Sequence, residues 1–302
     1  MAPRPSPFVD RIQEWDGLGV VVRHDRPTGT WIFVALHDDT LGRPTGGCRM
    51  RVYGHPSEGL RDALRLAEGM TRKWAVIDLP YGGGKAVLAV PRPLQGEERR
   101  GLLRRFGELL ESLKGAFSTG EDLGTTPADM ACLATVTRWV KATGVRGGEP
   151  VDPGPYTALG VLEGIRAALA AAFGDGELAG RTVLVQGVGD VGEPLARMLS
   201  AEGARLLLSD LDHGRVESLA GELQARPVSP DEVYWTACDV YAPCAVGATL
   251  NSGTIPQLRC RVVAGSANNQ LETEADADAL RERGILYAPD YVVNGGGALA
   301  LG

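Results

Sequence analysis

Residues 182–192 read TVLVQGVGDVG, an apolar run that passes directly into a glycine-rich turn. The turn has glycines at positions 187, 189 and 192, and the helical pattern EPLARMLSAEG follows it. Glycines at this spacing permit a tight turn, a close approach of the main chain to a pyrophosphate, and close packing of the helix. Because the N-terminus of a helix favours an anion, this stretch predicts a dinucleotide-binding turn.

A GxGxxG turn alone is weak evidence, because such turns also arise from packing, and a doubly wound sheet without a ligand is the alternative. Here the next apolar run, LLLSD, ends at Asp210. A carboxylate there would accept both ribose hydroxyls of an adenosine and repel a 2′-phosphate, which predicts NAD rather than NADP. The turn residues predicted to contact NAD are Gly187, Val188, Gly189, Asp190, Val191 and Gly192.

The organisation of the chain around this turn predicts two α/β domains. Apolar strands and helical patterns alternate through the second half, which is typical of a parallel sheet with helices on both faces. The stretch TGVRGGEPVDPGP, residues 143–155, is rich in glycine and proline, and we place the boundary there. We expect an N-terminal α/β catalytic domain, residues 1–148, and a C-terminal Rossmann-type doubly wound domain, residues 149–302, with a cleft between them.

Several local elements of the first half can also be predicted. The runs GLGVVVRHD and GTWIFVALHDD, joined by RPTGT, predict a strand pair. An amphipathic helix is expected from Ser57, with Ser57 as its N-cap, and a second from EERRGLLRRFGELLESL. Between them the run AVLAV, which follows YGGGK, predicts a short apolar strand.

Composition limits the classes of partner. The formal net charge is −7 and no strong basic patch occurs, which argues against nucleic acid or an acidic membrane as a partner. The five cysteines form no CxxC pair and have no histidine cluster beside them, so we expect no metal site. We find no signal peptide and no run of about 18 apolar residues. We therefore expect a cytoplasmic protein.

Three polar side chains are candidates for catalysis, although their local sequence leaves each undecided. Lys85 ends YGGGK, where three glycines imply that another group closely approaches the main chain. A phosphate loop is disfavoured because its pattern requires Ser or Thr after the lysine, and Ala86 stands there. A solvated lysine on a surface hairpin stays an alternative. Lys73 lies at the end of the Ser57 helix, where a surface cation is favoured. Asp122 is either a functional acid or a turn residue before a helix that begins near Pro127.

From about Leu36 to Gly297 the chain resembles the glutamate, leucine, phenylalanine and valine dehydrogenases. The matching segments are TGGCRM, DALRLAEGMTRK, LPYGGGKAV, STGEDLGTTPADM, GVGDVG, DVYAPCAVGA, VVAGSANNQL and GILYAPDYVVNGGG. The resemblance implies that Lys73 binds the substrate carboxylate, that Lys85 is the catalytic acid or base, and that Asp122 shuttles a proton to and from the amino group. Burial and a second cation close by would favour deprotonation of Lys85 near neutral pH.

The same resemblance implies further contacts. Gly47 and Met70 are expected beside the substrate, Thr157 and Asn268 near the nicotinamide and its ribose, and Asn294 near the reacting amine. For Asn268 and Asn294 the alternative is a role in left-handed or turn backbone among the neighbouring glycines. The implied partners are a small L-amino acid or 2-oxo acid and ammonia, and the chain is expected to form a homo-oligomer.

Thr45 bears on the choice of substrate. Glutamate-specific relatives carry a lysine immediately before the glycine pair that matches positions 46 and 47, and here that residue is Thr45. Without this cation a dicarboxylate loses its partner, so the resemblance implies an apolar L-amino acid, deaminated oxidatively and reversibly with reduction of NAD. The alternatives are a glutamate dehydrogenase and a non-catalytic paralogue that binds NAD or an amino acid. The non-catalytic paralogue is considered because relatives continue past VVNGGG with a helical segment that this sequence lacks.

Overall fold

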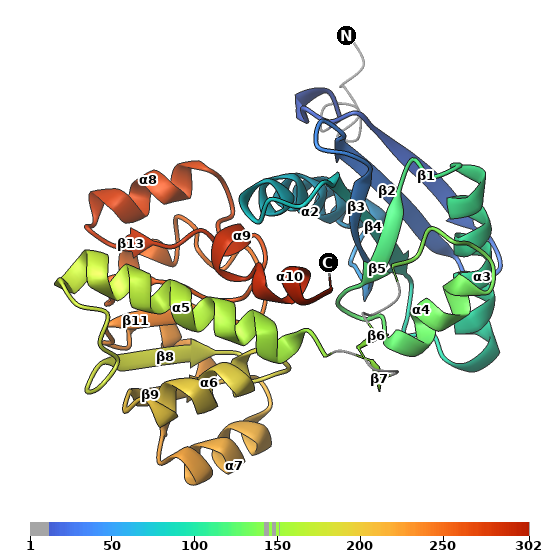
Figure 1. Cartoon of the computed structure of the whole chain (residues 1–302). Coiled ribbons are helices and arrows are strands. Elements are labelled where there is room, and N and C mark those ends of the chain that lie inside the picture. The colour runs from blue at the N-terminus through green and yellow to red at the C-terminus, as the bar shows by residue number, and fades with distance from the viewer. Residues whose placement is uncertain (1–11, 142–144, 147–148, 151, 302) are drawn as a thin grey trace, which may run out of the picture. The chain divides into compact units, whose positions relative to one another are not determined.

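The computed structural model describes residues 12–301 except 142–144, 147–148 and 151, and it contains two compact units (Figure 1). The first unit is Met1–Val151 and the second is Asp152–Gly302. The division falls within the stretch rich in glycine and proline at which we place the domain boundary. Near the end of the first unit, β6 (Val145–Arg146) and β7 (Glu149–Pro150) form a short antiparallel pair.

A five-stranded mixed sheet forms the centre of the first unit. Its strands lie in the order β1 (Gly19–Asp25), β2 (Thr30–Asp38), β4 (Gly82–Val90), β3 (Pro44–Val52) and β5 (Ser118–Glu121). β1 and β2 form the predicted strand pair, which is antiparallel, and β2 is also antiparallel to β4. Since β4, β3 and β5 are mutually parallel, their carboxyl ends share one edge of the sheet.

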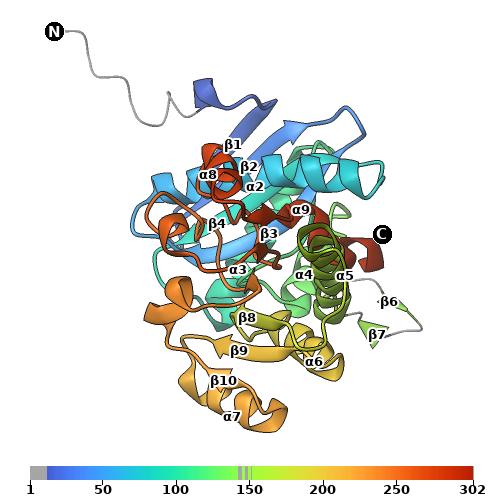
Figure 2. The ribbon, with the colours of Figure 1, turned by 90° about the vertical axis from the view of Figure 1, so that its left-hand side faces the viewer.

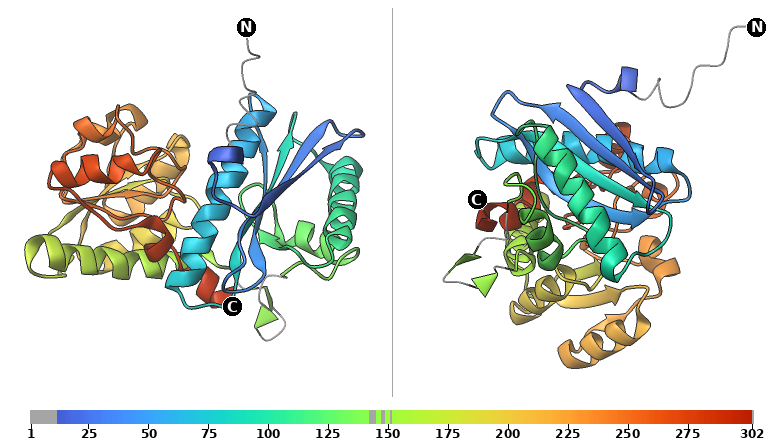
Figure 3. Two further views of the ribbon diagram at one scale, coloured as in Figure 1. Left: turned by 90° about the horizontal axis from the view of Figure 1, so that it is seen from above. Right: turned by 90° about the vertical axis from the view of Figure 1, so that its right-hand side faces the viewer.

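Helices cover both faces of this sheet (Figure 3, left). On one face α2 (Pro56–Val76) packs its apolar residues against those of β2 and β4. On the other face α3 (Gly96–Ser112) and α4 (Pro127–Ala134) enclose a separate apolar cluster around Leu88 and Phe106. The predicted N-cap of α2 was wrong: the side chain of His55 caps the helix by accepting from the Ser57 amide, because Pro56 occupies the first helical position.

The three glycines before Lys85 belong to β4 itself, and the predicted start of this strand at Ala86 was wrong. A Cβ at Gly82 would lie 2.0 Å from the carbonyl oxygen of Asp38, and one at Gly83 would lie 1.8 Å from Thr71 Oγ1 of α2. The close approach that the glycines allow is therefore made by neighbouring elements of the protein. Lys85 is 3% exposed in the middle of the strand, which excludes a solvated surface hairpin.

A six-stranded parallel sheet forms the second unit. The order is β10 (Arg226–Pro227), β9 (Arg205–Ser209), β8 (Thr182–Gln186), β11 (Val240–Pro243), β12 (Val262–Val263) and β13 (Leu286–Tyr287). Figure 2 shows β8, β9 and β10 side by side. The strand order reverses direction between β8 and β11, as in a doubly wound Rossmann-type sheet. The run ILYAPDYVV is strand only at 286–287, and α9 (Asp290–Val293) follows.

Helices cover both faces of the second sheet as well. One face packs on α5 (Gly154–Phe173), α6 (Gly192–Ala201) and α7 (His213–Leu223). The other packs on α8 (Ala275–Glu282) and on the short 3-10 helices η1 (Pro230–Trp235) and η2 (Ile255–Gln257). The last described helix, α10 (Gly296–Leu301), lies against α5.

One described helix, α5, is long and apolar enough to cross a membrane by length and composition alone, although Glu163 and Arg166 interrupt its apolar residues. Its residues Val161, Ile165 and Leu169 are fully buried in the apolar cluster of the parallel sheet. The core helix of a doubly wound domain meets the same criterion, and α5 occupies that position here.

Candidate active site

Lys85, Gly47 and Asp122 come together on the α2 face of the first sheet. Lys85, Val87 and Ala89 are every second residue of β4 and therefore share one face of the sheet. Val87 and Ala89 pack on α2, so the side chain of Lys85 lies on the α2 face. Its Nζ lies 3.0 Å from Asp122 Oδ1. A Cβ at Gly47 would lie 2.7 Å from the Asp122 Cβ and 3.2 Å from Lys85 Nζ, so any larger residue there would crowd the ion pair.

The loop that follows β5 fixes the position of Asp122. The amide of Asp122 donates to Thr125 Oγ1 (3.0 Å), and that hydroxyl lies 2.9 Å from the carbonyl oxygen of Cys48 on β3. Gly124 has φ +80°, and a Cβ there would lie 1.9 Å from the Met50 carbonyl oxygen. The next helix, α4, begins at the predicted Pro127 and is capped by Thr126. Asp122 is therefore held by a rigid turn.

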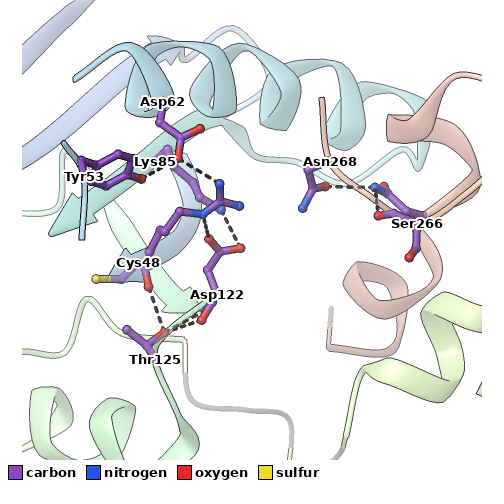
Figure 4. A network of polar contacts seen from close by, with 10 residues as sticks. Cys48, Tyr53, Asp62, Lys85, Asp122, Thr125, Ser266 and Asn268 are labelled. Atoms are coloured by element: carbon purple, nitrogen blue, oxygen red, sulfur yellow. Dashed lines mark hydrogen bonds and ion pairs between the residues drawn. The ribbon is translucent and has the colours of Figure 1, made fainter. Parts of the chain in front are cut away.

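Three residues that sequence reasoning missed extend the network (Figure 4). Arg49 on β3 places Nε 2.8 Å from Asp122 Oδ2 and its terminal nitrogen 2.9 Å from Asp62 Oδ2 on α2. The hydroxyl of Tyr53 donates to the same Asp62 oxygen at 2.6 Å. The signal that could have found Arg49 is its place two residues after Gly47 in a strand, which puts both residues on one face.

The charges of this network act on one another. Burial lowers the pKa of Lys85 below its ordinary 10.5, the attraction of Asp122 opposes this, and the charge of Arg49 lowers it further. Burial raises the pKa of Asp122, but the charges of Lys85 and Arg49 outweigh it and hold that pKa well below its usual range. Arg49 thus supplies a second cation of the kind expected to favour a neutral Lys85 beside an ionised Asp122.

The remaining predicted substrate residues lie around the same part of the sheet. Lys73 is half-buried in the last turn of α2, one turn beyond Met70. A Cβ at Gly46 would lie 3.2 Å from Met70 Cγ, which places Met70 over the strand that carries Gly47. Thr45 is 3% exposed, and its hydroxyl donates to the carbonyl oxygen of Arg43. The Thr45 carbonyl accepts from the indole of Trp74 at 2.8 Å.

In the second unit the glycine turn joins β8 to α6 as predicted. Gly187 has φ +96°, and a Cβ at Gly192 would lie 1.8 Å from the Gly187 carbonyl oxygen, so both positions require glycine. A Cβ at Gly189 would meet nothing nearer than Arg215 at 3.8 Å. Asp210 Oδ2 accepts from the Val188 amide at 2.8 Å. Of the other turn residues, Asp190 is exposed and Val191 half-buried.

These observations fit a dinucleotide. The main chain is uncovered at Gly189, where the pyrophosphate is expected, and it lies at the N-terminus of α6. The carboxylate of Asp210 lies beside the turn, where a ribose is expected. Among the described residues no group of three or more His, Cys, Asp or Glu side chains could hold a metal ion.

The predicted residues Asn268, Asn294 and Thr157 also lie in the second unit. Asn294 Nδ2 donates to Asn268 Oδ1 and to the Ser266 carbonyl, each at 3.0 Å. Asn294 is 4% exposed, and its Oδ1 accepts no hydrogen bond from the part of the chain that the structure describes. The left-handed residue in this segment is Asn269 rather than Asn268. Thr157, in the first turn of α5, donates to the Pro153 carbonyl.

Two family models and several curated proteins match this chain. Residues 23–139 match the model of the Glu/Leu/Phe/Val dehydrogenase dimerisation domain, and residues 207–300 match that of glutamate/leucine/phenylalanine/valine dehydrogenase. Leucine dehydrogenase of Bacillus subtilis is 43% identical over 289 residues, which are 95% of this chain and 79% of the relative. The chain belongs to the glutamate/leucine/phenylalanine/valine dehydrogenase family.

Two further members of the family are similar. Phenylalanine dehydrogenase of Lysinibacillus sphaericus is 39% identical over 287 residues, covering 93% of this chain and 74% of the relative. The crystal structure of L-tryptophan dehydrogenase from Nostoc punctiforme has a TM-score of 0.74 and 38% identity, and the match covers 96% of this chain and 83% of that one. The matched ranges of the family include Lys73, Lys85, Asp122, Asp210 and Asn294.

Proposed function

We propose that this protein catalyses the reversible oxidative deamination of an apolar L-amino acid. One amino acid, one NAD and one water give the 2-oxo acid, ammonium and NADH. The observation that carries the proposal is the buried pair of Lys85 Nζ and Asp122, 3.0 Å apart, in a setting that lowers the pKa of the lysine. A buried lysine whose pKa is lowered, beside a fixed carboxylate, can move protons in both directions.

Each polar residue has a separate role in this proposal. NAD supplies the acceptor for the hydride from the substrate Cα. Lys85, when neutral, takes a proton from the water that attacks the imine carbon, and it is protonated as the C–O bond forms. The ionised Asp122 first takes a proton from the ammonium group of the substrate and later returns it to the amino group, which then leaves as ammonia. The ammonium of Lys73 is a suitable point-charge partner for the substrate carboxylate.

An apolar side chain on the substrate is supported by Thr45 and by the relatives. Thr45 is buried with its hydroxyl bonded to Arg43, so the position where glutamate-specific relatives carry a lysine offers no cation here. The similar proteins described above are named for leucine, phenylalanine and tryptophan. We also propose a homo-oligomer, which the matched dimerisation domain supports, and a cytoplasmic location.

A substrate panel tests the proposed reaction. Purified protein is given NAD and, singly, leucine, valine, isoleucine, phenylalanine, tryptophan or glutamate as the L-isomer at alkaline pH, and NADH is followed by absorbance. We expect turnover of one or more of the apolar substrates. A rate no higher than that of Lys85→Ala with every substrate would support the non-catalytic paralogue, and turnover of glutamate alone would support a glutamate dehydrogenase.

The choice of NAD over NADP is assigned to the charge of Asp210. The substitution Asp210→Asn keeps an acceptor for the Val188 amide but removes the charge that repels a 2′-phosphate. We expect the ratio of kcat/KM for NAD to that for NADP to fall about tenfold, the effect of roughly 1.4 kcal/mol. The exposed Asp231 of η1 provides the control, and Asp231→Asn should leave the ratio unchanged. An unchanged ratio in Asp210→Asn would contradict this assignment.

A further inference from the structure

Arg49 divides its guanidinium between two carboxylates that come from different elements. Its Nε lies 2.8 Å from Asp122 Oδ2, and its terminal nitrogen lies 2.9 Å from Asp62 Oδ2. The side chains of Arg49 and Asp122 are only 12% and 14% exposed. Asp122 thus receives two cations on separate oxygens, Lys85 on Oδ1 and Arg49 on Oδ2.

The two cations differ in one property that matters for proton transfer. The guanidinium of arginine stays charged throughout the pH range of enzymes, whereas a buried lysine can lose its proton. Whenever Lys85 is neutral, Asp122 would be a buried carboxylate without a countercharge if Arg49 were absent. Such a carboxylate is costly and would draw the proton back to Lys85 or take up one itself. A permanent countercharge on Oδ2 removes this penalty.

Other charged and titratable groups surround the network. α2 contributes Asp62 and, in its last turn, Lys73. From the strands come Glu121 at the end of β5 and the buried thiol of Cys48 on β3. Arg99 on α3 and Asp129 on α4 form a separate ion pair at 2.6 Å. The phenol of Tyr53 donates to Asp62, so it orients the carboxylate that holds the far end of Arg49.

From this arrangement we infer that Arg49 is a positioning residue of the proposed dehydrogenase reaction: it holds Asp122 ionised and in place so that Lys85 can give up and regain its proton. Asp62 and Tyr53 hold Arg49 in turn. This inference rests on the proposed function. Arg49 contacts Asp122 and Asp62 and acts through them.

The test is the pH dependence of kcat/KM for oxidative deamination, in which Lys85 must be neutral. Arg49→Gln removes a repulsive cation from Lys85 and frees Asp122 to attract it. The acidic limb of the profile should therefore move to higher pH, by about one unit. In Arg49→Lys the positive charge is retained, so the acidic limb should move less than in Arg49→Gln. Arg105→Gln is the matched control, because it breaks another arginine–aspartate pair of the same unit, between α3 and β1, and should leave the limb in place.

Asp62→Asn separates a positioning role from a merely structural one. This variant keeps Arg49 but removes the carboxylate that partly neutralises it, and the charge of Asp62 also favours the protonated form of Lys85. The acidic limb should consequently move to lower pH, opposite to the shift in Arg49→Gln. General loosening of the site would move both variants in the same direction. Shifts of the same sign, or an unmoved limb in folded Arg49→Gln and Arg49→Lys, would overturn the inference.

A second readout does not depend on turnover. In protein labelled with ¹³C at the lysine Cε, the Lys85 resonance is assigned by its loss in Lys85→Met, and its titration is followed by NMR. We expect the midpoint to be higher in Arg49→Gln than in the unaltered protein. If the unaltered protein turned over no amino acid, the proposed function would fail, while this titration would still decide whether Arg49 controls the proton of Lys85.

Discussion

Replacing Lys85 by alanine is expected to lower kcat for the apolar L-amino acid by about a thousandfold, the usual range for loss of a general acid or base. Alanine cannot accept the proton of the attacking water, and the neighbouring Asp122 is already ionised and paired with Arg49. The folded state should tolerate the change, because Arg49 still compensates the charge of Asp122. The substitution should therefore lower kcat and change the thermal unfolding temperature little.

Steady-state rates and melting curves of Lys85→Ala and Lys114→Ala check this prediction. Lys114 is an exposed lysine of the same unit, and its replacement should leave kcat unchanged. In the unaltered protein the acidic limb of kcat/KM should lie below pH 10.5, the ordinary pKa of lysine, because burial lowers that of Lys85. Retention of more than about a tenth of the rate by Lys85→Ala would show that another group is the base.

The parts of the fold that sequence predicted best are those set by local pattern. The glycine turn between β8 and α6 was predicted because its glycine spacing follows from local backbone geometry, such as the positive φ of Gly187 and the contact between Gly192 and Gly187. The β1–β2 pair was predicted from two β-rich runs and a turn. Both features depend on neighbours in sequence.

The candidate site was only partly predictable, because its contacts join distant residues. Arg49 and Asp122 are 73 residues apart, and Arg49 and Asp62 lie on a strand and a helix whose facing sides are set by packing. Local spacing left Lys85 and Asp122 undecided, and only the family resemblance paired them. The alternation in TGGCRM could have placed Arg49 on the same face as Gly47, but its two carboxylate partners could be identified only from the structure.

The glycines of β4 lead to a prediction about stability. In Gly83→Ala the new Cβ would lie 1.8 Å from Thr71 Oγ1, 2.5 Å from the Thr71 nitrogen and 2.6 Å from the Ala67 carbonyl oxygen. Two of these contacts are to the backbone of α2, so no side-chain rotation relieves them, and α2 must move away from β4. We expect a loss of about 3 kcal/mol of folding free energy, at the upper end for overpacking.

This displacement should also lower activity, because α2 carries Met70 and Lys73 while β4 carries Lys85. Chemical denaturation of the full chain, with kcat and KM measured below the transition, tests both effects. Gly19→Ala is the matched control: it adds the same methyl group to the same sheet, at a position with nothing within 4 Å, and should change stability by less than about 0.5 kcal/mol. If Gly83→Ala were as stable as Gly19→Ala, the direct packing of α2 on β4 would be wrong. If it were destabilised but retained full kcat and KM, the positions of Met70, Lys73 and Lys85 would not depend on that packing.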